Sequence, residues 1–310
     1  MMCNKKTFFT IFVFFCVIIS TIIIQNCTNS EPVPEDTSSY VLSIQEWHGN
    51  RIESLKKNVL SVVGLFWLKD GENSFGSDPT NDIVFQKEES PEFIGTFTVR
   101  NGKVRIKINP GIEVLCEGET VSEMELQNDF DGKATILSLE PLSWYVIRRN
   151  EDFGIRLRDI ENPLISQFKS IVAFTIDPEW RLEARFEPHE KTKTIGMTTA
   201  SGAVRELPSP GSLTFNISNK PFKLDVMTLV NANSYFIIFA DETNGYETYG
   251  GGRFLFVEKA GADGTTIIDF NKSINPPCAL TDFYACPLPP PQNRLPIKVT
   301  GGEKKYESTL

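Results

Sequence analysis

Short runs of alternating apolar and polar residues, separated by turn signals, dominate the chain from Val59 to Asn271. The clearest pair is FTVRNGKVRIKI, residues 97–108, in which Asn101-Gly102 joins two such runs. Asn-Gly favours the type I′ turn of a two-residue β-hairpin, because both central residues of that turn take positive φ. Many short strands at regular spacing are typical of antiparallel sandwiches and barrels. The pattern therefore predicts a mainly β fold of sandwich or barrel-like antiparallel sheets.

One stretch near the N-terminus follows a helical period instead. Its apolar residues recur at near-helical spacing, with charged residues between them: Val41, Ile44, Trp47, Ile52 and Leu55. Residues 36–39, Asp-Thr-Ser-Ser, offer side chains that cap helix N-termini. We therefore expect one amphipathic helix over residues 39–58, packed against the sheet that follows it.

The first residues have the layout of a secretory signal, in which two lysines precede an almost wholly apolar run from Phe8 to Ile24. The sequence Ile24-Gln25-Asn26-Cys27 resembles a relaxed lipobox, although the usual small residues before the cysteine are missing. We expect a signal peptide over residues 1–27 and an acyl chain on Cys27. The expected location is the cell envelope, lipid-anchored on its periplasmic or surface side.

The rest of the chain divides into a tether and a folded part. Residues 28–38 are polar and contain proline, which predicts a tether without a core. Residues 39–310 are long enough for one large or two modest domains. We expect a β-rich domain there, with a sub-boundary near residues 161–170, and the sequence leaves open whether its halves share one core.

The net charge and the motif content exclude several classes of partner and cofactor. The chain carries 31 Lys and Arg against 40 Asp and Glu, a formal net charge of −9. Nucleic acid and anionic membrane surfaces select basic patches, so neither is expected, and the bilayer enters only through the acyl anchor. No HxxH, HExxH or CxxC pattern is present, so no metal is expected. The triplet Gly250-Gly251-Gly252 lacks the strand and helix context of a dinucleotide fingerprint, so no cofactor is expected either.

The segment from Asp241 to Lys304, called here the C-terminal block, combines ligand-type polar residues with many prolines and glycines. Proline fixes φ, so such a segment loses little entropy on ordering and can hold side chains in place. This favours a prearranged site for a small polar or anionic ligand, because the planar guanidinium of arginine binds carboxylate or phosphate in pairs. The candidate ligand-binding residues are Tyr249, Arg253, Asn271, Asn293 and Arg294.

Two other classes of function stay open. An extracytoplasmic hydrolase could use Asp269 or Glu247 with His189, although no GxSxG motif is present. A structural envelope protein would use the same polar residues only to lock the fold, with Asp269 and Arg294 as a buried ion pair. The sequence does not decide whether the protein is an enzyme.

Cys278 and Cys286 close a short proline-rich loop in the C-terminal block. In an oxidising compartment they are candidates for a disulfide. Two buried thiols are the alternative, and the sequence leaves both open.

Three sequence blocks carry a resemblance to a known family. The first runs from Glu46 to Val84, and the second is IRLRD (Ile155–Asp159) with DPEWRLEARFEPH (Asp177–His189). The third is the C-terminal block, with ETYGGGRF, DFN, NPPCA and CPLPPPQNRLP. The chain resembles the bacterial and archaeal family called domain of unknown function 1684 over roughly residues 40–306. The resemblance implies no activity and no functional residues.

Overall fold

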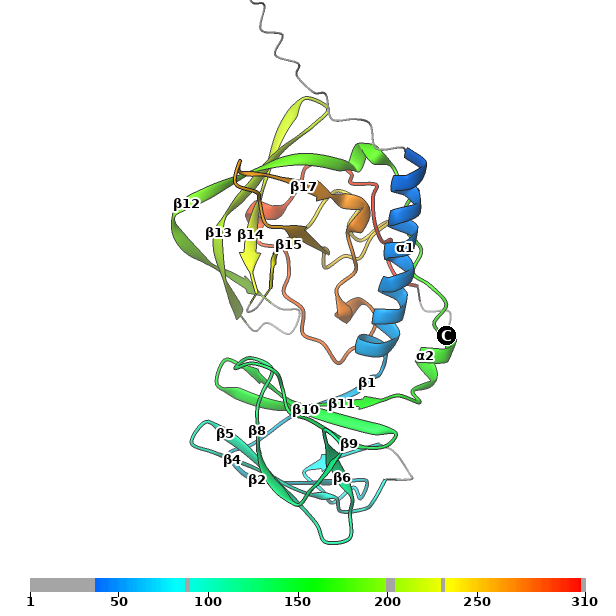
Figure 1. Cartoon of the computed structure of the whole chain (residues 1–310), viewed down its shortest axis with the longest axis vertical. Coiled ribbons are helices and arrows are strands. Elements are labelled where there is room, and N and C mark those ends of the chain that lie inside the picture. Colours follow the sequence, from blue (N-terminus) through cyan, green and yellow to red (C-terminus); the bar gives the residue numbers. More distant parts are fainter. Residues whose placement is uncertain (1–36, 87–89, 199–203, 230–231, 308–310) are drawn as a thin grey trace, which may run out of the picture. The chain divides into compact units, whose positions relative to one another are not determined.

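The computed structural model describes residues 37–86, 90–198, 204–229 and 232–307. The predicted signal peptide and Cys27 lie outside these ranges, so the acyl anchor stays a prediction. Within the described residues, no helix combines the length and the apolar character that crossing a membrane requires. The fold is mostly β, with antiparallel sheets, one of them nearly closed like a barrel, and one N-terminal helix (Figure 1). The fold class predicted from the alternating runs is confirmed.

Residues 62–159 form two of the three sheets. The first has the strand order β1-β11-β10-β9-β6-β7, and the second has the order β3-β2-β4-β5-β8. The strands of the first sheet are β1 (Val62–Trp67), β6 (Val114–Cys116), β7 (Glu119–Val121), β9 (Ile136–Leu139), β10 (Leu142–Arg149) and β11 (Asp152–Asp159). The strands of the second are β2 (Gly71–Gly76), β3 (Ile83–Val84), β4 (Gly95–Arg100), β5 (Lys103–Ile108) and β8 (Glu123–Leu126).

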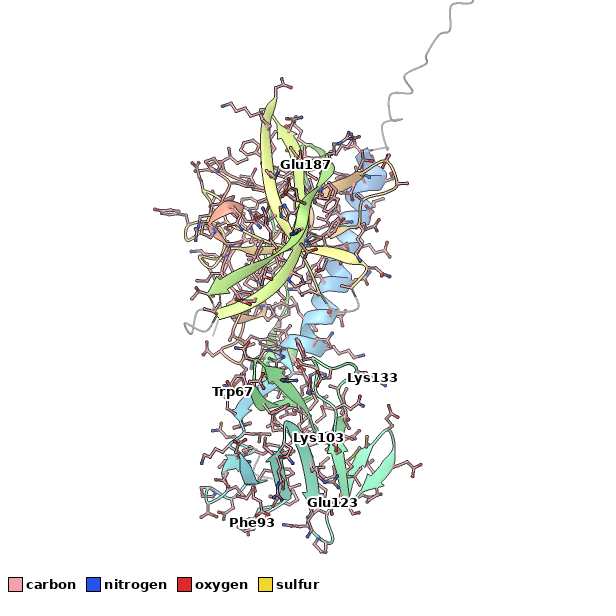
Figure 2. All side chains as sticks on the ribbon, turned by 90° about the vertical axis from the view of Figure 1, so that its left-hand side faces the viewer. Trp67, Phe93, Lys103, Glu123, Lys133 and Glu187 are labelled. Atoms are coloured by element: carbon pink, nitrogen blue, oxygen red, sulfur yellow. The ribbon has the colours of Figure 1, made fainter. Side chains whose placement is uncertain are left out.

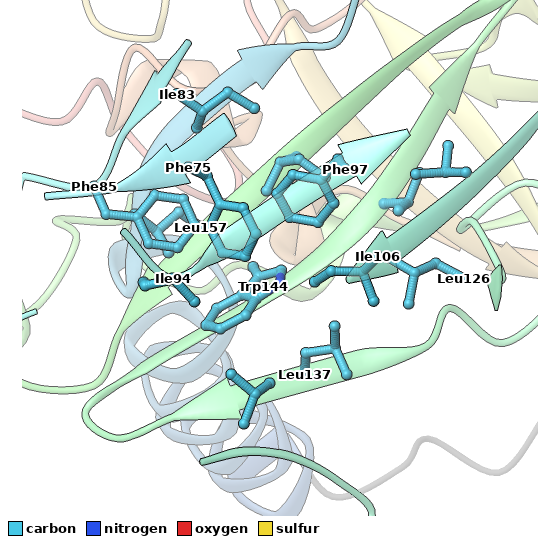
Figure 3. Close-up of a cluster of buried hydrophobic side chains, with 14 of the residues drawn as sticks. Phe75, Ile83, Phe85, Ile94, Phe97, Ile106, Leu126, Leu137, Trp144 and Leu157 are labelled. Carbon is cyan, nitrogen blue, oxygen red and sulfur yellow. The ribbon is translucent and has the colours of Figure 1, made fainter. Parts of the chain in front are cut away.

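An aromatic cluster fills the core of these two sheets. Phe75 stacks on Phe97 with ring centroids 4.3 Å apart, and its edge meets Trp144 at 5.7 Å (Figure 3). The predicted hairpin forms as β4 and β5, with positive φ at Asn101 (53°) and Gly102 (71°). On its solvent side, Lys103 pairs with Glu125 and Arg105 with Glu123 on β8, at 2.9 and 3.1 Å. Figure 2 labels Lys103 and Glu123 on this surface.

The third sheet has the strand order β16-β15-β14-β13-β12-β17. Its strands are β12 (Arg181–Thr198), β13 (Val204–Ile217), β14 (Lys220–Thr228), β15 (Ser234–Phe239), β16 (Arg253–Glu258) and β17 (Thr265–Asp269). The long pair β12 and β13 changes register between Pro188 and Lys193. Phe215, Phe239 and Phe270 meet edge-on in the core of this sheet.

The predicted N-terminal helix is confirmed as α1 (Thr37–Leu55), which continues as the π-helical turn η1 (Lys56–Leu60). The remaining short helices are α2 (Pro163–Gln167), η2 (Pro178–Trp180), η3 (Phe270–Lys272), η4 (Pro277–Ala279) and η5 (Pro291–Asn293). We expected α1 to pack against the sheet that follows it. Its buried polar contacts are instead with the C-terminal block, where Tyr40 reaches Asp269 and Arg51 reaches Glu303.

Candidate functional site

Arg253, predicted as a ligand-binding residue, is fully buried at the start of β16. Its two terminal nitrogens donate to the carbonyls of Gly301 (2.5 Å) and Val299 (2.9 Å), and one lies 3.3 Å from the Asp241 carboxylate. Burial lowers the pKa of this guanidinium, and the Asp241 charge opposes that effect. The arginine therefore holds the backbone around Val299 and Gly301, and its burial gives no support to a role in ligand binding.

Asp269 and Asn271 form a second buried network. Both oxygens of the Asp269 carboxylate accept from the Tyr40 hydroxyl of α1 at 3.0 Å, and one also accepts from the backbone N–H of Asn271. The Asn271 amide donates to Tyr40 and to the carbonyl of Asp177. The structural alternative placed an ion pair between Asp269 and Arg294, but Arg294 is exposed and Asp269 is bonded to Tyr40 instead.

Asn293 is fully buried, and its side chain hydrogen-bonds to the main chain instead of facing an open surface. Its amide oxygen accepts from the backbone N–H of Asp225 at 2.8 Å, and its nitrogen donates to the carbonyls of Asp225 and Ile238. The structure thus distributes the five predicted ligand-binding residues over separate networks. Among the described residues, Arg253 and Arg294 do not contact each other. Tyr249 lies beside Cys278, which lines a cavity.

His189 is brought together with neither Asp269 nor Glu247. Its Nε2 lies 3.4 Å from the Ser209 hydroxyl and 3.9 Å from the Asp225 carboxylate. Asp225 also accepts from Ser212 at 2.7 Å and from Gln292 at 3.2 Å. A Ser-His-Asp triad needs the serine and the carboxylate on opposite ring nitrogens, whereas here one nitrogen faces both groups.

Two arginines that sequence reasoning did not weigh form the most ligand-like cluster. Arg156 and Arg158 lie on the same face of β11, and each donates towards the hydroxyl of Tyr145, at 3.3 and 3.5 Å. The Arg156 guanidinium also lies 4.4 Å from the ring centroid of Tyr284, which belongs to the C-terminal block. Among the described residues, neither arginine has a carboxylate within 4.0 Å, and the buried Nε atom of each has no partner.

The signal for this pair was present in the sequence. In IRLRD the arginines are two positions apart in a strand, and residues at that spacing share one face. Their contact with Tyr284 could not be inferred, because Tyr284 is far along the chain.

The two cysteines of the C-terminal block lie together beside a cavity. The Cys286 sulfur accepts from the backbone N–H of Cys278 at 3.3 Å, and the Tyr249 hydroxyl lies 3.8 Å from the Cys278 sulfur. Cys278 lines a cavity of about 240 Å³. The other lining residues are Leu60, Leu164, Ala279, Leu280, Thr281, Asp282 and Tyr306. The structure holds both cysteines as thiols, so the disulfide between them stays a prediction.

No group of three histidine, cysteine, aspartate or glutamate side chains suited to a metal ion occurs among the described residues. The side-chain clusters described above could support three kinds of chemistry: anion binding at Arg156 and Arg158, thiol chemistry at Cys278 and Cys286, and hydrogen bonding around His189.

Comparison with known proteins adds family information and no activity. No curated protein matches the chain. An uncharacterized protein of Haloarcula marismortui, solved by solution NMR, is similar at 30% sequence identity, over 45% of this chain and 78% of that one. The TM-score is 0.38, too low to establish a shared fold.

A family model supports the resemblance seen in the C-terminal motifs. It covers the DPEWRLEARFEPH block and all of the C-terminal block, whereas the earlier blocks at Glu46–Val84 and Ile155–Asp159 lie outside it. Over residues 166–304, the chain matches the family described as Protein of unknown function (DUF1684).

Proposed function

We propose that this protein is a lipid-anchored envelope protein that binds a small anionic ligand, with Arg156 and Arg158 as its main contacts. The observation that carries the proposal is the pair of guanidinium groups that converge on one tyrosine hydroxyl without a carboxylate partner among the described residues. The C-terminal block takes part through Tyr284. The proposal therefore keeps the anionic ligand and the C-terminal block of the sequence-based hypothesis, but it assigns the binding to different arginines.

The energetics of the cluster favour an anion. Arg156 is only 8% exposed, and burying a positive charge is costly unless an opposite charge or hydrogen bonds compensate for it. Arg156 lies over the Tyr284 ring and Arg158 over the Tyr145 ring, and each such contact contributes about 0.5–2 kcal/mol of cation–π attraction. Two like charges at one hydroxyl also repel each other, so a bound carboxylate or phosphate would relieve both costs.

The test is a thermal-unfolding measurement on the full chain with inorganic phosphate and with citrate as separate probes. A probe present at 100 times its Kd should stabilise the folded protein by about 2.7 kcal/mol. Arg156→Gln and Arg158→Gln should each remove most of this stabilisation while the variants remain folded.

Arg294→Gln is the matched control, because Arg294 is an exposed arginine of the C-terminal block. It should leave the stabilisation unchanged. If Arg294→Gln abolishes the response and Arg156→Gln does not, the site is the one that sequence reasoning named, and the present assignment is wrong.

A hydrolase is the second candidate, and the contact of His189 with Ser209 and Asp225 is the observation that favours it. Ser209 is fully buried, and the shared ring nitrogen does not match triad geometry. Binding therefore has the stronger support. Turnover of small ester substrates by the wild type that is lost in His189→Gln would reverse this order.

The third candidate, a structural envelope protein, is supported by the networks of Arg253, Asp269 and Asn293, which all hold main chain. It makes no use of Arg156 and Arg158, so an absence of any anion response would favour it.

A further inference from the structure

The prolines around Cys278 and Cys286 hold the two cysteines close together. Cys278 lies in η4, directly after Pro276 and Pro277, and Cys286 precedes Pro287. The Cys286 sulfur is 3.3 Å from the backbone nitrogen of Cys278, so the side chain of one residue reaches the backbone of the other. Disulfides join residues whose Cα atoms are about 4.4–6.8 Å apart, and this contact is compatible with that range.

The surroundings of Cys278 favour its thiolate. The Cys286 thiol, as the main cause, and the Tyr249 hydroxyl lower the pKa of Cys278 to about 7, against the opposing effect of burial. Burial and the neighbouring Cys278 raise the pKa of Tyr249 to about 12, so its hydroxyl remains a donor at neutral pH. Thiolate is the nucleophilic form of cysteine, and a thiol with a pKa near the ambient pH exchanges with disulfides fastest.

The two cysteines differ in access. Cys278 is half-buried and lines the cavity of about 240 Å³, whereas Cys286 is 6% exposed. An accessible attacking thiol with a second thiol within reach suits thiol–disulfide exchange, because the rate depends on access to the attacking thiolate and the second thiol can resolve the mixed disulfide. A disulfide that only strengthened the loop would need neither the cavity nor the Tyr249 hydroxyl.

We propose that Cys278 and Cys286 form a thiol–disulfide exchange site, with Cys278 as the attacking thiol, Cys286 as the resolving thiol and a small-molecule or peptide disulfide as the substrate class. This inference is independent of the anion-binding proposal, because it uses neither arginine.

The reaction has two balanced steps. The Cys278 thiolate attacks one sulfur of the substrate disulfide, forms a mixed disulfide and releases the other half of the substrate as a thiolate. The Cys286 thiolate then attacks the Cys278 sulfur, forms the internal disulfide and releases the second half. Two electrons pass from the cysteine pair to the substrate, and the two protons from the cysteine thiols are taken up by the released thiolates.

The test treats the full-length reduced protein with oxidised glutathione at pH 7 and locates the products by peptide mass spectrometry. In the wild type, a disulfide between Cys278 and Cys286 should accumulate with little glutathione bound. In Cys286→Ser, which keeps a hydroxyl donor beside Cys278, a mixed disulfide with glutathione should accumulate at Cys278. In Cys278→Ser, modification of Cys286 should be at least tenfold slower than that of Cys278 in the wild type.

Cys116 is the internal control, since it is a half-buried thiol on β6 away from this loop. The proposal is wrong if Cys116 reacts with oxidised glutathione as fast as Cys278, or if Cys286→Ser accumulates no mixed disulfide at Cys278. The reaction rates of Cys116 and Cys278 are compared in the wild type, so this comparison tests the proposal even if a variant fails to fold.

Tyr249→Phe adds a readout that a loop-strengthening disulfide would not change. Loss of the hydroxyl should move the midpoint of the pH dependence of Cys278 alkylation to higher pH. An unchanged midpoint would contradict the role assigned to Tyr249.

Discussion

The Tyr40 hydroxyl lies 3.0 Å from both carboxylate oxygens of Asp269, although the two residues are 229 positions apart in the chain. This contact attaches the first turn of α1 to the end of β17. Burial and the negative charge of Asp269 raise the pKa of Tyr40, so the hydroxyl stays protonated and donates.

Tyr40→Phe tests how much this attachment contributes. The change removes the Tyr40 hydroxyl and leaves the buried Asp269 carboxylate with fewer hydrogen-bond donors, which should cost about 1–3 kcal/mol of folding free energy. Urea unfolding followed by circular dichroism measures it. Tyr246→Phe is the control, because Tyr246 is 81% exposed and its loss should change the free energy by less than about 0.5 kcal/mol. Equal effects of the two changes would show that the contact adds nothing.

The pair of Arg253 and Asp241 gives a second stability prediction. Arg253→Met leaves the buried Asp241 carboxylate without its opposite charge, and breaking such a pair costs about 3–5 kcal/mol. Combining it with Asp241→Asn should cost less than the sum of the two single changes, because both remove the same interaction. Chemical denaturation of the four proteins measures the coupling, and strict additivity would rule it out.

The buried Glu303 should make the stability of the protein depend on pH. Burial raises its pKa above the usual value of 4.5, and the Arg51 charge opposes this effect. A raised folded-state pKa means that the folded protein binds the proton more tightly than the unfolded chain. The resulting contribution to stability is therefore present below about pH 4.5 and is lost as the pH rises through the folded-state pKa.

Glu303→Gln checks the sign of that dependence. The variant cannot titrate at this position, so the stability of the wild type relative to the variant should decrease as the pH is raised from 4 towards 8. Unfolding free energies at several pH values provide the comparison. A relative stability that increases over this range would mean that the Arg51 charge outweighs burial.

Gly252 should not tolerate a side chain. Its φ is +85°, and a Cβ atom there would collide with the Pro289 ring and the carbonyl oxygen of Phe239. Gly252→Ala should therefore destabilise the protein by about 2–4 kcal/mol, through backbone strain and overpacking together.

Gly250→Ala is the matched control from the same glycine triplet. The nearest atom to its added Cβ would be 3.7 Å away, which is an ordinary contact. Thermal unfolding of both variants gives the comparison. A similar melting temperature for the two would show that the close approach of Pro289 is not needed.

The sequence predicted the local elements well where short-range rules decide them. The Asn101-Gly102 hairpin and the N-terminal helix both depend on neighbouring residues, and both form as expected. Around Pro188 short-range rules do not decide the structure, because a proline inside an alternating run favours the end of a strand, whereas β12 continues past it as one irregular strand. A register change accommodates the proline there, and proline is tolerated at such irregularities.

The candidate site was harder to predict, because burial decides it. Arg253 in the sequence has the same hydrogen-bonding groups whether it faces a ligand or two carbonyls, and only the position of Val299 and Gly301 shows which applies. Arg156 and Arg158 had the opposite difficulty, since they stand in a plain strand motif. What makes them a candidate site is the arrival of Tyr284 from the C-terminal block.

The attachment of α1 to the C-terminal block also sets an order of events during synthesis. The helix is translated well before its partners, because Tyr40 precedes Asp269 by 229 positions and Arg51 precedes Glu303 by 252. The helix therefore stays undocked, with its apolar face exposed or covered by a chaperone, until those partners have been synthesised. A chain that stops early, or that a protease shortens before Glu303, would keep an intact helix with no place to dock.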